Sequence, residues 1–176
     1  MIQKILLAVD GSDHAAKAAA FCGDLASRYD ADVVLLHVLD PRQFTPEHQR
    51  MAEVEHILPA GHGQLPWVEN VPAELAAMLQ EDTTSEGRSR VLGYLADKVV
   101  GDTTRVLRKH GLDDGRLRCL LKNGNPVSGI LETASDEQAD LIVMGSRGLS
   151  SLRGLAQGSV SQKVSHLADC TVLTVK

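Results

Sequence analysis

The sequence predicts an α/β fold: a three-layer, open, doubly wound sheet of five parallel strands in the common order 3-2-1-4-5. Two observations predict it. Strand-sized apolar runs alternate with helical patterns, and these runs are apolar throughout rather than at every second residue. Uniformly apolar strands are typical of a parallel sheet covered by helices on both faces. At 176 residues, the chain is expected to form one domain, residues 1–176.

The first part of the chain reads as strand, helix, strand. Residues 2–10, IQKILLAVD, form a compact apolar run that ends in Asp10. Residues 13–31 are rich in alanine and carry apolar positions three and four apart, which predicts a helix. Residues 32–40, DVVLLHVLD, are rich in β-branched side chains and have the length of a strand.

The second part repeats the alternation. Apolar residues at helical spacing predict a long helix that stops near Gly111, and Pro126 suits the first turn of the next helix. The predicted elements are a helix at 86–111, a strand at 116–124, a helix at 126–138, a strand at 139–145, a helix at 159–169 and a strand at 170–176.

A proline-rich insertion is predicted at about 40–85. It holds five of the six prolines, which are disfavoured inside helices and central strands. Residues 47–58 and 72–80 are expected to form two short amphipathic helices. A long insertion in a compact domain is often a lid or a contact surface, and a tolerated surface loop explains it equally well.

Composition excludes several classes of protein. The net charge of −5 argues against a general affinity for nucleic acid, and an aromatic content of 3% leaves few platforms for stacking bases. Neither a membrane span nor a signal peptide is legible, so we expect a cytoplasmic protein. Cys22, Cys119 and Cys170 are far apart and odd in number, so we interpret all three as small buried residues.

Two unusual features fall at the ends of predicted strands. Asp10 ends the first strand, and Gly145 ends the fourth and opens a glycine-rich stretch. In the predicted strand order the two strands are neighbours, so both features converge where open α/β sheets bind ligands. A carboxylate accepts hydrogen bonds from ribose hydroxyls, and backbone N–H groups bind phosphates, so the pair suits a nucleotide.

The glycine-rich stretch matches neither a P-loop nor a G-x-G-x-x-G motif. Its pattern G-x2-G-x9-G-[ST], at Gly145, Gly148, Gly158 and Ser159, resembles the nucleotide-binding pattern of the universal stress protein family. ILLAVDGSDHA, LLHVLD, GNP and CTVLTVK extend the resemblance over nearly the whole chain apart from the insertion. It implies an adenine nucleotide alpha hydrolase-like fold of the single-domain type that carries the ATP-binding motif.

The resemblance also implies roles for individual residues. Asp10 matches an aspartate that contacts ribose or adenine; its alternative role is a charge beside the helix that begins near Ser12. Val38 lies where the family binds adenine through main-chain atoms of the second strand. Gly145 and Gly148 match the first phosphate turn.

The second phosphate turn is matched by Gly158 and Ser159, with Val160 and Ser161 following at the helix N-terminus. There a hydroxyl and backbone amides would meet the β- and γ-phosphates. Ser159 and Gln162 also fit a capping box, so the hydroxyl has a competing role.

Other polar residues have weaker assignments. Gly124 is either a contact or a turn residue, and Arg147 and Arg153 either bind phosphate or face solvent. The spacing of His48, His56 and His62 matches no zinc motif, so no protein metal site is predicted. Magnesium or manganese would arrive with the nucleotide phosphates.

Taken with the resemblance, these features predict an ATP-binding regulatory module of the stress response, with ADP or AMP as other possible ligands. The family further implies a homodimer paired through the last strand and an unknown regulatory protein partner. No catalytic residues are assigned. Two alternatives stay open: a slow ATPase or autophosphorylating enzyme that uses the same pocket, and a dimeric scaffold that does not bind ATP.

Overall fold

The structure is a computed structural model that describes residues 2–40, 85–148 and 157–176. Its contacts divide the chain into two compact units, Met1–Leu39 with Ala96–Lys176, and Asp40–Leu95. The predicted insertion and its two helices fall almost entirely outside the described residues. The insertion and the single-domain organisation therefore stay predictions.

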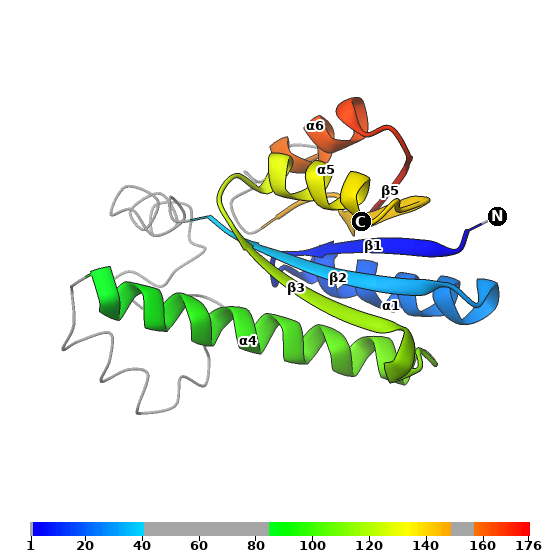
Figure 1. Cartoon of the computed structure of the whole chain (residues 1–176), viewed down its shortest axis with the longest axis horizontal. Helices are drawn as coiled ribbons and strands as arrows, with labels where there is room; N and C mark the ends of the chain where they lie inside the picture. The colour runs from blue at the N-terminus through cyan, green and yellow to red at the C-terminus, as the bar shows by residue number, and fades with distance from the viewer. Residues whose placement is uncertain (1, 41–84, 149–156) are drawn as a thin grey trace. The chain divides into compact units, whose positions relative to one another are not determined.

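The first unit is built on a five-stranded parallel sheet in the order β3-β2-β1-β4-β5, which confirms the predicted fold (Figure 1). The central strand β1 (Lys4–Val9) lies between β2 (Asp32–Leu39) and β4 (Leu141–Gly145). The edges are β3 (Leu117–Asn123) and β5 (Thr171–Val175).

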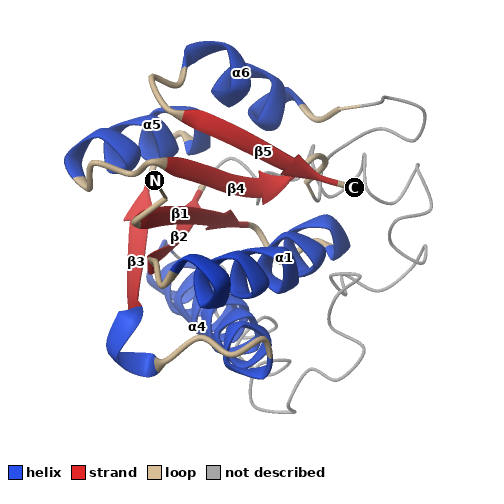
Figure 2. Ribbon diagram, turned by 90° about the vertical axis from the view of Figure 1, so that its right-hand side faces the viewer, coloured by secondary structure: helices blue, strands red, loops and turns tan. Residues whose placement is uncertain are grey.

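Helices cover both faces of the sheet (Figure 2). One face carries α1 (Asp13–Tyr29) and the part of α4 (Ser85–Lys109) from Ala96 onward, and the other carries α5 (Pro126–Asp136) and α6 (Ser159–Leu167). Alternate residues of β1 serve the two cores, Leu7 facing α1 and Leu6 facing α5. Because both sides of the central strands are buried, their sequences are apolar on both faces, with His37 of β2 as a buried polar residue.

Local signals set the ends of the helices. At the start of α1, the Ser12 hydroxyl accepts a hydrogen bond from the Ala15 N–H (3.2 Å). The helix ends at Asp30, whose φ of 58° lies in the left-handed region. In front of α5, the Asn125 side chain accepts from the Val127 N–H (2.9 Å), and Pro126 takes the first turn as predicted.

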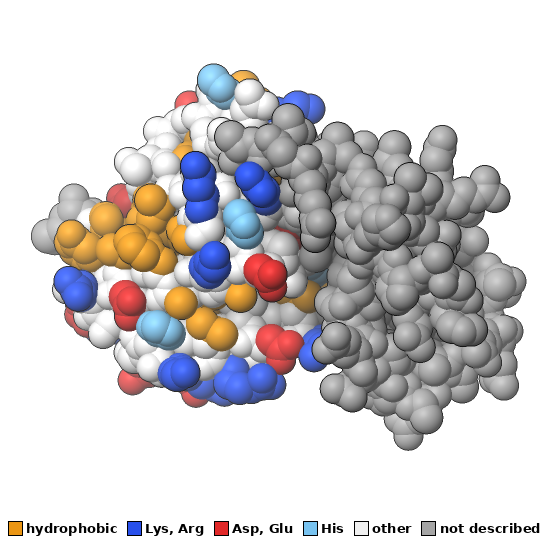
Figure 3. Space-filling view, turned by 180° about the vertical axis from the view of Figure 1, so that it is seen from behind, with side chains coloured by type: hydrophobic (Ala, Val, Ile, Leu, Met, Phe, Trp, Pro, Cys, Tyr) orange, Lys and Arg blue, Asp and Glu red, His pale blue; other side chains and the backbone are white. Residues whose placement is uncertain are grey.

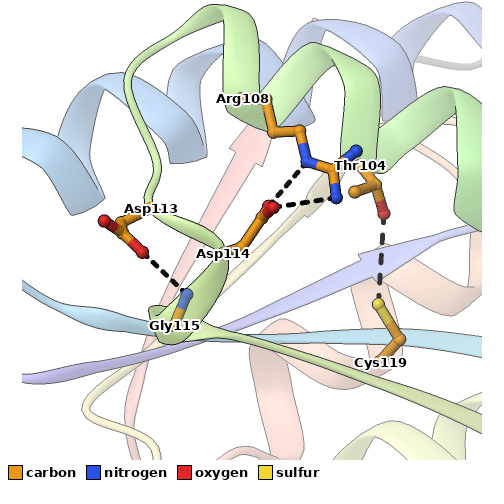
Figure 4. Close-up of polar contacts among 6 residues, drawn as sticks. All are labelled: Thr104, Arg108, Asp113, Asp114, Gly115 and Cys119. Atoms are coloured by element: carbon orange, nitrogen blue, oxygen red, sulfur yellow. Dashed lines mark hydrogen bonds and ion pairs between the residues drawn. The ribbon is translucent and has the colours of Figure 1, made fainter.

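The connection from α4 to β3 is held by charged and polar contacts (Figure 4). Arg108, near the end of α4, donates from Nε and Nη2 to both carboxylate oxygens of Asp114, at 2.6 and 3.1 Å. Asp113 accepts from the Gly115 N–H at 2.8 Å. These contacts close the turn that feeds the edge strand β3.

The edge strand β3 departs from the prediction of fully buried strands. Arg118, Cys119 and Leu121 are exposed, since β3 is an edge strand of the described sheet. The interpretation of all three cysteines as buried is therefore wrong: Cys119 is exposed, Cys170 is partly buried and only Cys22 is fully buried. Burial raises the pKa of the Cys22 thiol to about 12.

Candidate functional site

The carboxyl ends of β1 and β4 bring Asp10 and the glycine-rich stretch to one edge of the sheet. Ala8 of β1 pairs with Met144 of β4, so Asp10, just after β1, lies near Gly145, the last residue of β4. This is the point at which the strand order reverses, and open α/β sheets bind ligands there.

Asp10 contacts both α1 and the loop after β4. Its Oδ1 accepts a hydrogen bond from the Ser12 N–H (3.0 Å), so the carboxylate lies beside the start of α1. Its Oδ2 lies where a Cβ on Gly148 would be, closer than any real Cβ contact. Gly148 has no side chain to place there, which lets the loop backbone approach the Asp10 carboxylate. The two roles predicted for Asp10 are compatible in this geometry.

Gly145 packs tightly on the first turn of α1. A Cβ at this position would lie 2.9 Å from the Ala15 nitrogen and 2.9 Å from the His14 carbonyl carbon. Backbone atoms cannot move aside as the end of a flexible side chain does. The absent side chain at Gly145 therefore sets how closely β4 approaches α1.

Gly158 joins the second turn to the first. Its N–H donates to the Ser146 carbonyl at 2.7 Å, although a Cβ here would make only ordinary contacts, 3.4 Å from the Arg147 Cα. The hydrogen bond to Ser146, rather than a lack of space for a side chain, therefore fixes the position of Gly158. The two glycine turns predicted from the sequence lie next to each other.

The predicted capping box is wrong. The N-cap of α6 is Gly158, in an extended conformation, and no side chain caps the helix. Ser159 is the first helical residue and is exposed, and the Gln162 N–H donates to the Gly158 carbonyl at 3.0 Å. Since the helix begins one residue earlier than a Ser159 cap requires, its first amides are not used by a capping side chain.

The two residues after Ser159 lie deeper in the fold. Ser161 is buried and its hydroxyl donates to the carbonyls of Ser146 (2.8 Å) and Gly158 (3.0 Å). Val160 is partly buried against the core on the α5 side of the sheet. The structure thus places Ser161 as a support beneath the turns.

Val38 and Gly124 lie at the same edge of the sheet, at the ends of β2 and β3. The Val38 side chain packs against α5, where its Cγ2 would lie 3.0 Å from a Cβ on Gly129. Gly124 has a φ of 129° and donates its N–H to the Leu39 carbonyl at 2.9 Å. The positive φ explains why this position holds a glycine. This is the turn role, one of the two roles predicted for Gly124.

Arg147 lies between the two turns. Its carbonyl accepts from the Ser12 hydroxyl at 3.3 Å, and its Nε is buried without a hydrogen-bond partner among the described residues. A buried guanidinium N–H needs an acceptor. An anion at this position would satisfy it. Arg153 and the histidines of the insertion lie outside the described residues.

Sequence analysis missed three polar residues around these turns. Ser146 and His14 share a hydrogen bond of 2.9 Å, although 132 positions separate them in sequence. His37 of β2 is buried and donates from Nδ1 to the Val9 carbonyl at 2.8 Å. A single histidine within the apolar run LLHVLD is the one local signal that singles His37 out.

Ser146 and His14 do not form a nucleophilic pair. Ser146 is 1% exposed, so its hydroxyl cannot reach a substrate. Ser146 is therefore not placed to act as a nucleophile with His14 as its base. In the described part of the chain, no three His, Cys, Asp or Glu side chains gather as metal ligands.

The described surface bears on two classes of protein, those that bind nucleic acids and those that span membranes. On the face drawn in Figure 3, acidic side chains lie among the basic ones, which do not form one continuous surface. Within the described ranges, no helix combines the length and the apolar character that crossing a bilayer requires.

The fold and the position of the site define a doubly wound α/β domain with a glycine-rich loop at its switch point. The family model described as "Universal stress protein family" matches residues 1–176. The chain belongs to this family, as the glycine pattern predicted. A curated relative, "Universal stress protein in QAH/OAS sulfhydrylase 3'region" of Thermus aquaticus, is 34% identical over 176 residues that cover 100% of each chain.

Solved structures show the same fold. A universal stress protein in complex with cAMP has a TM-score of 0.59 at 20% identity, covering 99% of this chain and 96% of its own. The universal stress protein of Archaeoglobus fulgidus in complex with dAMP has a TM-score of 0.56 at 20% identity, covering 100% of this chain and 98% of its own.

Proposed function

We propose that the chain binds an adenine nucleotide, with ATP as the principal ligand, where β1 and β4 end. The observation that carries the proposal is the close approach of Gly148 to the Asp10 carboxylate, which joins a hydrogen-bond acceptor to a loop of backbone donors. Two structural neighbours are complexes with adenine nucleotides, cAMP and dAMP, which supports the class of ligand.

Each part of a nucleotide has a chemical counterpart in the proposed site. Asp10 would accept from ribose hydroxyls, and main-chain atoms of Val38 would bind adenine, with Gly124 beside them. The turns at Gly145 and Gly148 would hold the first phosphates.

The outer phosphates would lie at the start of α6, where Gly158, Ser159 and Val160 offer backbone amides and a hydroxyl to negative charge. Arg147 would donate its buried Nε–H to a phosphate oxygen. Magnesium or manganese would accompany the phosphates as their counterion.

The proposed output is regulatory. The nucleotide-loaded and empty states would differ in the surface offered to a protein partner in the stress response. The homodimer through β5, the regulatory partner and the cytoplasmic location stay predictions.

Mass spectrometry of the purified, denatured protein for a bound nucleotide, followed by calorimetric titration with ATP, ADP and AMP, tests the proposal. The decisive variant is Gly148→Ala, because its methyl group would collide with Asp10 Oδ2. We expect its ATP affinity to fall by about fivefold or more, because the displaced Asp10 carboxylate belongs to the proposed site and overpacking costs about 1–3 kcal/mol.

The matched control is Gly101→Ala, since Gly101 is exposed on α4 and an added Cβ there meets no described atom within 4 Å. Its affinity for ATP should equal that of the wild type. Wild-type protein that carries no nucleotide and gives no titration signal would overturn the proposed function.

A further inference from the structure

Ser146 uses all its polar groups to connect separate elements. Its N–H donates to the Val175 carbonyl at 2.7 Å, which ties it to β5. Its carbonyl accepts from the Gly158 N–H (2.7 Å) and the Ser161 hydroxyl (2.8 Å) at the start of α6. Its hydroxyl shares a hydrogen bond with His14 Nδ1 of α1 at 2.9 Å.

These bonds meet inside the proposed phosphate site. Ser146 lies between the two glycines of the first turn, and its carbonyl is bonded to the first residue of the second turn. The backbone bonds fix it to β5 and α6. The side-chain bond to His14 is its polar link to α1, on the side where Asp10 lies.

The link between Ser146 and His14 does not depend on the histidine tautomer. A serine hydroxyl both donates and accepts, so it donates to a bare Nδ1 and accepts from a protonated one. Ser146 is buried, so water does not easily replace the bond to His14 when the histidine is substituted. The Ser146 hydroxyl would then rotate to another partner, or the turn would shift.

We propose that His14 and Ser146 are positioning residues that hold the first glycine turn against α1, in the geometry that binds nucleotide phosphates. The inference rests on the proposed nucleotide site. Neither His14 nor Ser146 is a defined position of the family's glycine pattern. Recognition of the phosphates should depend on this pair, and recognition of adenine and ribose should not.

Binding constants for ATP and for adenosine, measured by competition on the same protein, separate these two parts of recognition. We expect His14→Ala and Ser146→Ala each to weaken ATP about three- to tenfold, the range for one buried hydrogen bond, with adenosine affinity unchanged. The double variant should be about as weak as either single variant, because both remove the same bond.

A rescue and a matched control separate positioning from general damage. Asparagine places a polar atom close to where histidine holds Nδ1, so His14→Asn should recover most of the lost ATP affinity. His110→Ala removes a bond of similar length, from His110 Nδ1, just after the end of α4, to Asp24 of α1 (2.8 Å). Asp24 lies ten residues after His14 along α1, or about 15 Å away, so this variant should bind ATP as the wild type does.

The outcomes discriminate between the two proposals. Wild-type protein that binds neither ligand overturns the nucleotide site, and the positioning role with it. Normal ATP binding by His14→Ala and Ser146→Ala overturns the positioning role alone. Equal losses for ATP and adenosine, or no recovery in His14→Asn, also overturn it, because they indicate general disruption of the fold.

Discussion

Asp140 shows how one side chain joins the start of two neighbouring strands. Its Oδ2 accepts hydrogen bonds from the backbone N–H groups of Gln3 (2.8 Å) and Lys4 (3.0 Å), at the start of β1. These two donors hold the pKa of the Asp140 carboxyl below its usual value of 3.8. The charged form is therefore favoured in the folded state.

We expect Asp140→Ala to lower the melting temperature at neutral pH. A carboxyl whose pKa is depressed by folding stabilises the protein above its unfolded pKa, and the effect is lost as the pH falls through the folded pKa. The difference from the wild type should therefore shrink below pH 3.8. Thermal unfolding across this range measures it, with the exposed Asp169→Ala as the control; a constant difference would contradict the assignment.

At the scale of single residues, sequence reasoning succeeded where a role depends on local pattern. The glycines at 145, 148 and 158 could be placed because their spacing is itself the signal. The His14–Ser146 bond could not be found, because it joins side chains 132 positions apart. The error at Ser159 has a different cause: Gly158 also suits an N-cap, and its backbone conformation decides where α6 begins.

At the scale of elements, the contact between α1 and α4 depends on Gly23. A Cβ at this position would lie 2.6 Å from the His110 Cβ and 3.3 Å from the Leu107 carbonyl oxygen. The close approach brings Asp24 within hydrogen-bond distance of His110, at 2.8 Å. A buried glycine here lets the end of α4 lie directly on α1.

We expect Gly23→Ala to lower the free energy of unfolding by about 1–3 kcal/mol through overpacking, although alanine favours a helix. Gly101→Ala on α4 should instead be neutral or stabilise by up to about 1 kcal/mol, because its added methyl group has room. Urea unfolding of both variants checks the prediction. Equal stability of the two would mean that the helices move apart without cost.

The elements themselves could be predicted from periodicity, and all five strands and all four predicted core helices are confirmed within the described residues. Strand burial was less predictable. LRCLLKN of β3 mixes Arg118 and Lys122 with apolar residues, and the apolar Cys119 and Leu121 are exposed as well. A sequence shows which residues favour a strand, but the position of that strand in the sheet decides which faces are covered.

At the scale of the whole molecule, β5 is the candidate for pairing two copies, because it is an edge strand of the described sheet. Val175 accepts from the Ser146 N–H, so its backbone polar groups face β4. Both polar groups of a strand residue point the same way and alternate along the strand, so those of Thr174 point outward. An outward row of donors and acceptors can pair with another strand.

We expect the wild type to sediment as a dimer and Thr174→Pro to sediment as a monomer, since proline removes one outward N–H and spares the bonds to β4. Thr174→Ala keeps that N–H and should stay dimeric. Analytical ultracentrifugation over a range of concentrations measures the mass, and melting curves check folding. A monomeric wild type, or a dimeric proline variant, would contradict pairing through β5.

The central place of β1 has a consequence for how the chain becomes competent to bind. One partner of β1, β2, follows it closely in sequence, but the other is β4, where Leu141 pairs with Ile5. Contacts between residues so distant in sequence slow folding, because a long loop must close before they form. During synthesis on the ribosome, the side of β1 that β4 occupies in the folded protein would stay unpaired until β4 and α6 have been made. Nascent chains that end before β4 and α6 would therefore lack the proposed nucleotide site and would not bind nucleotide.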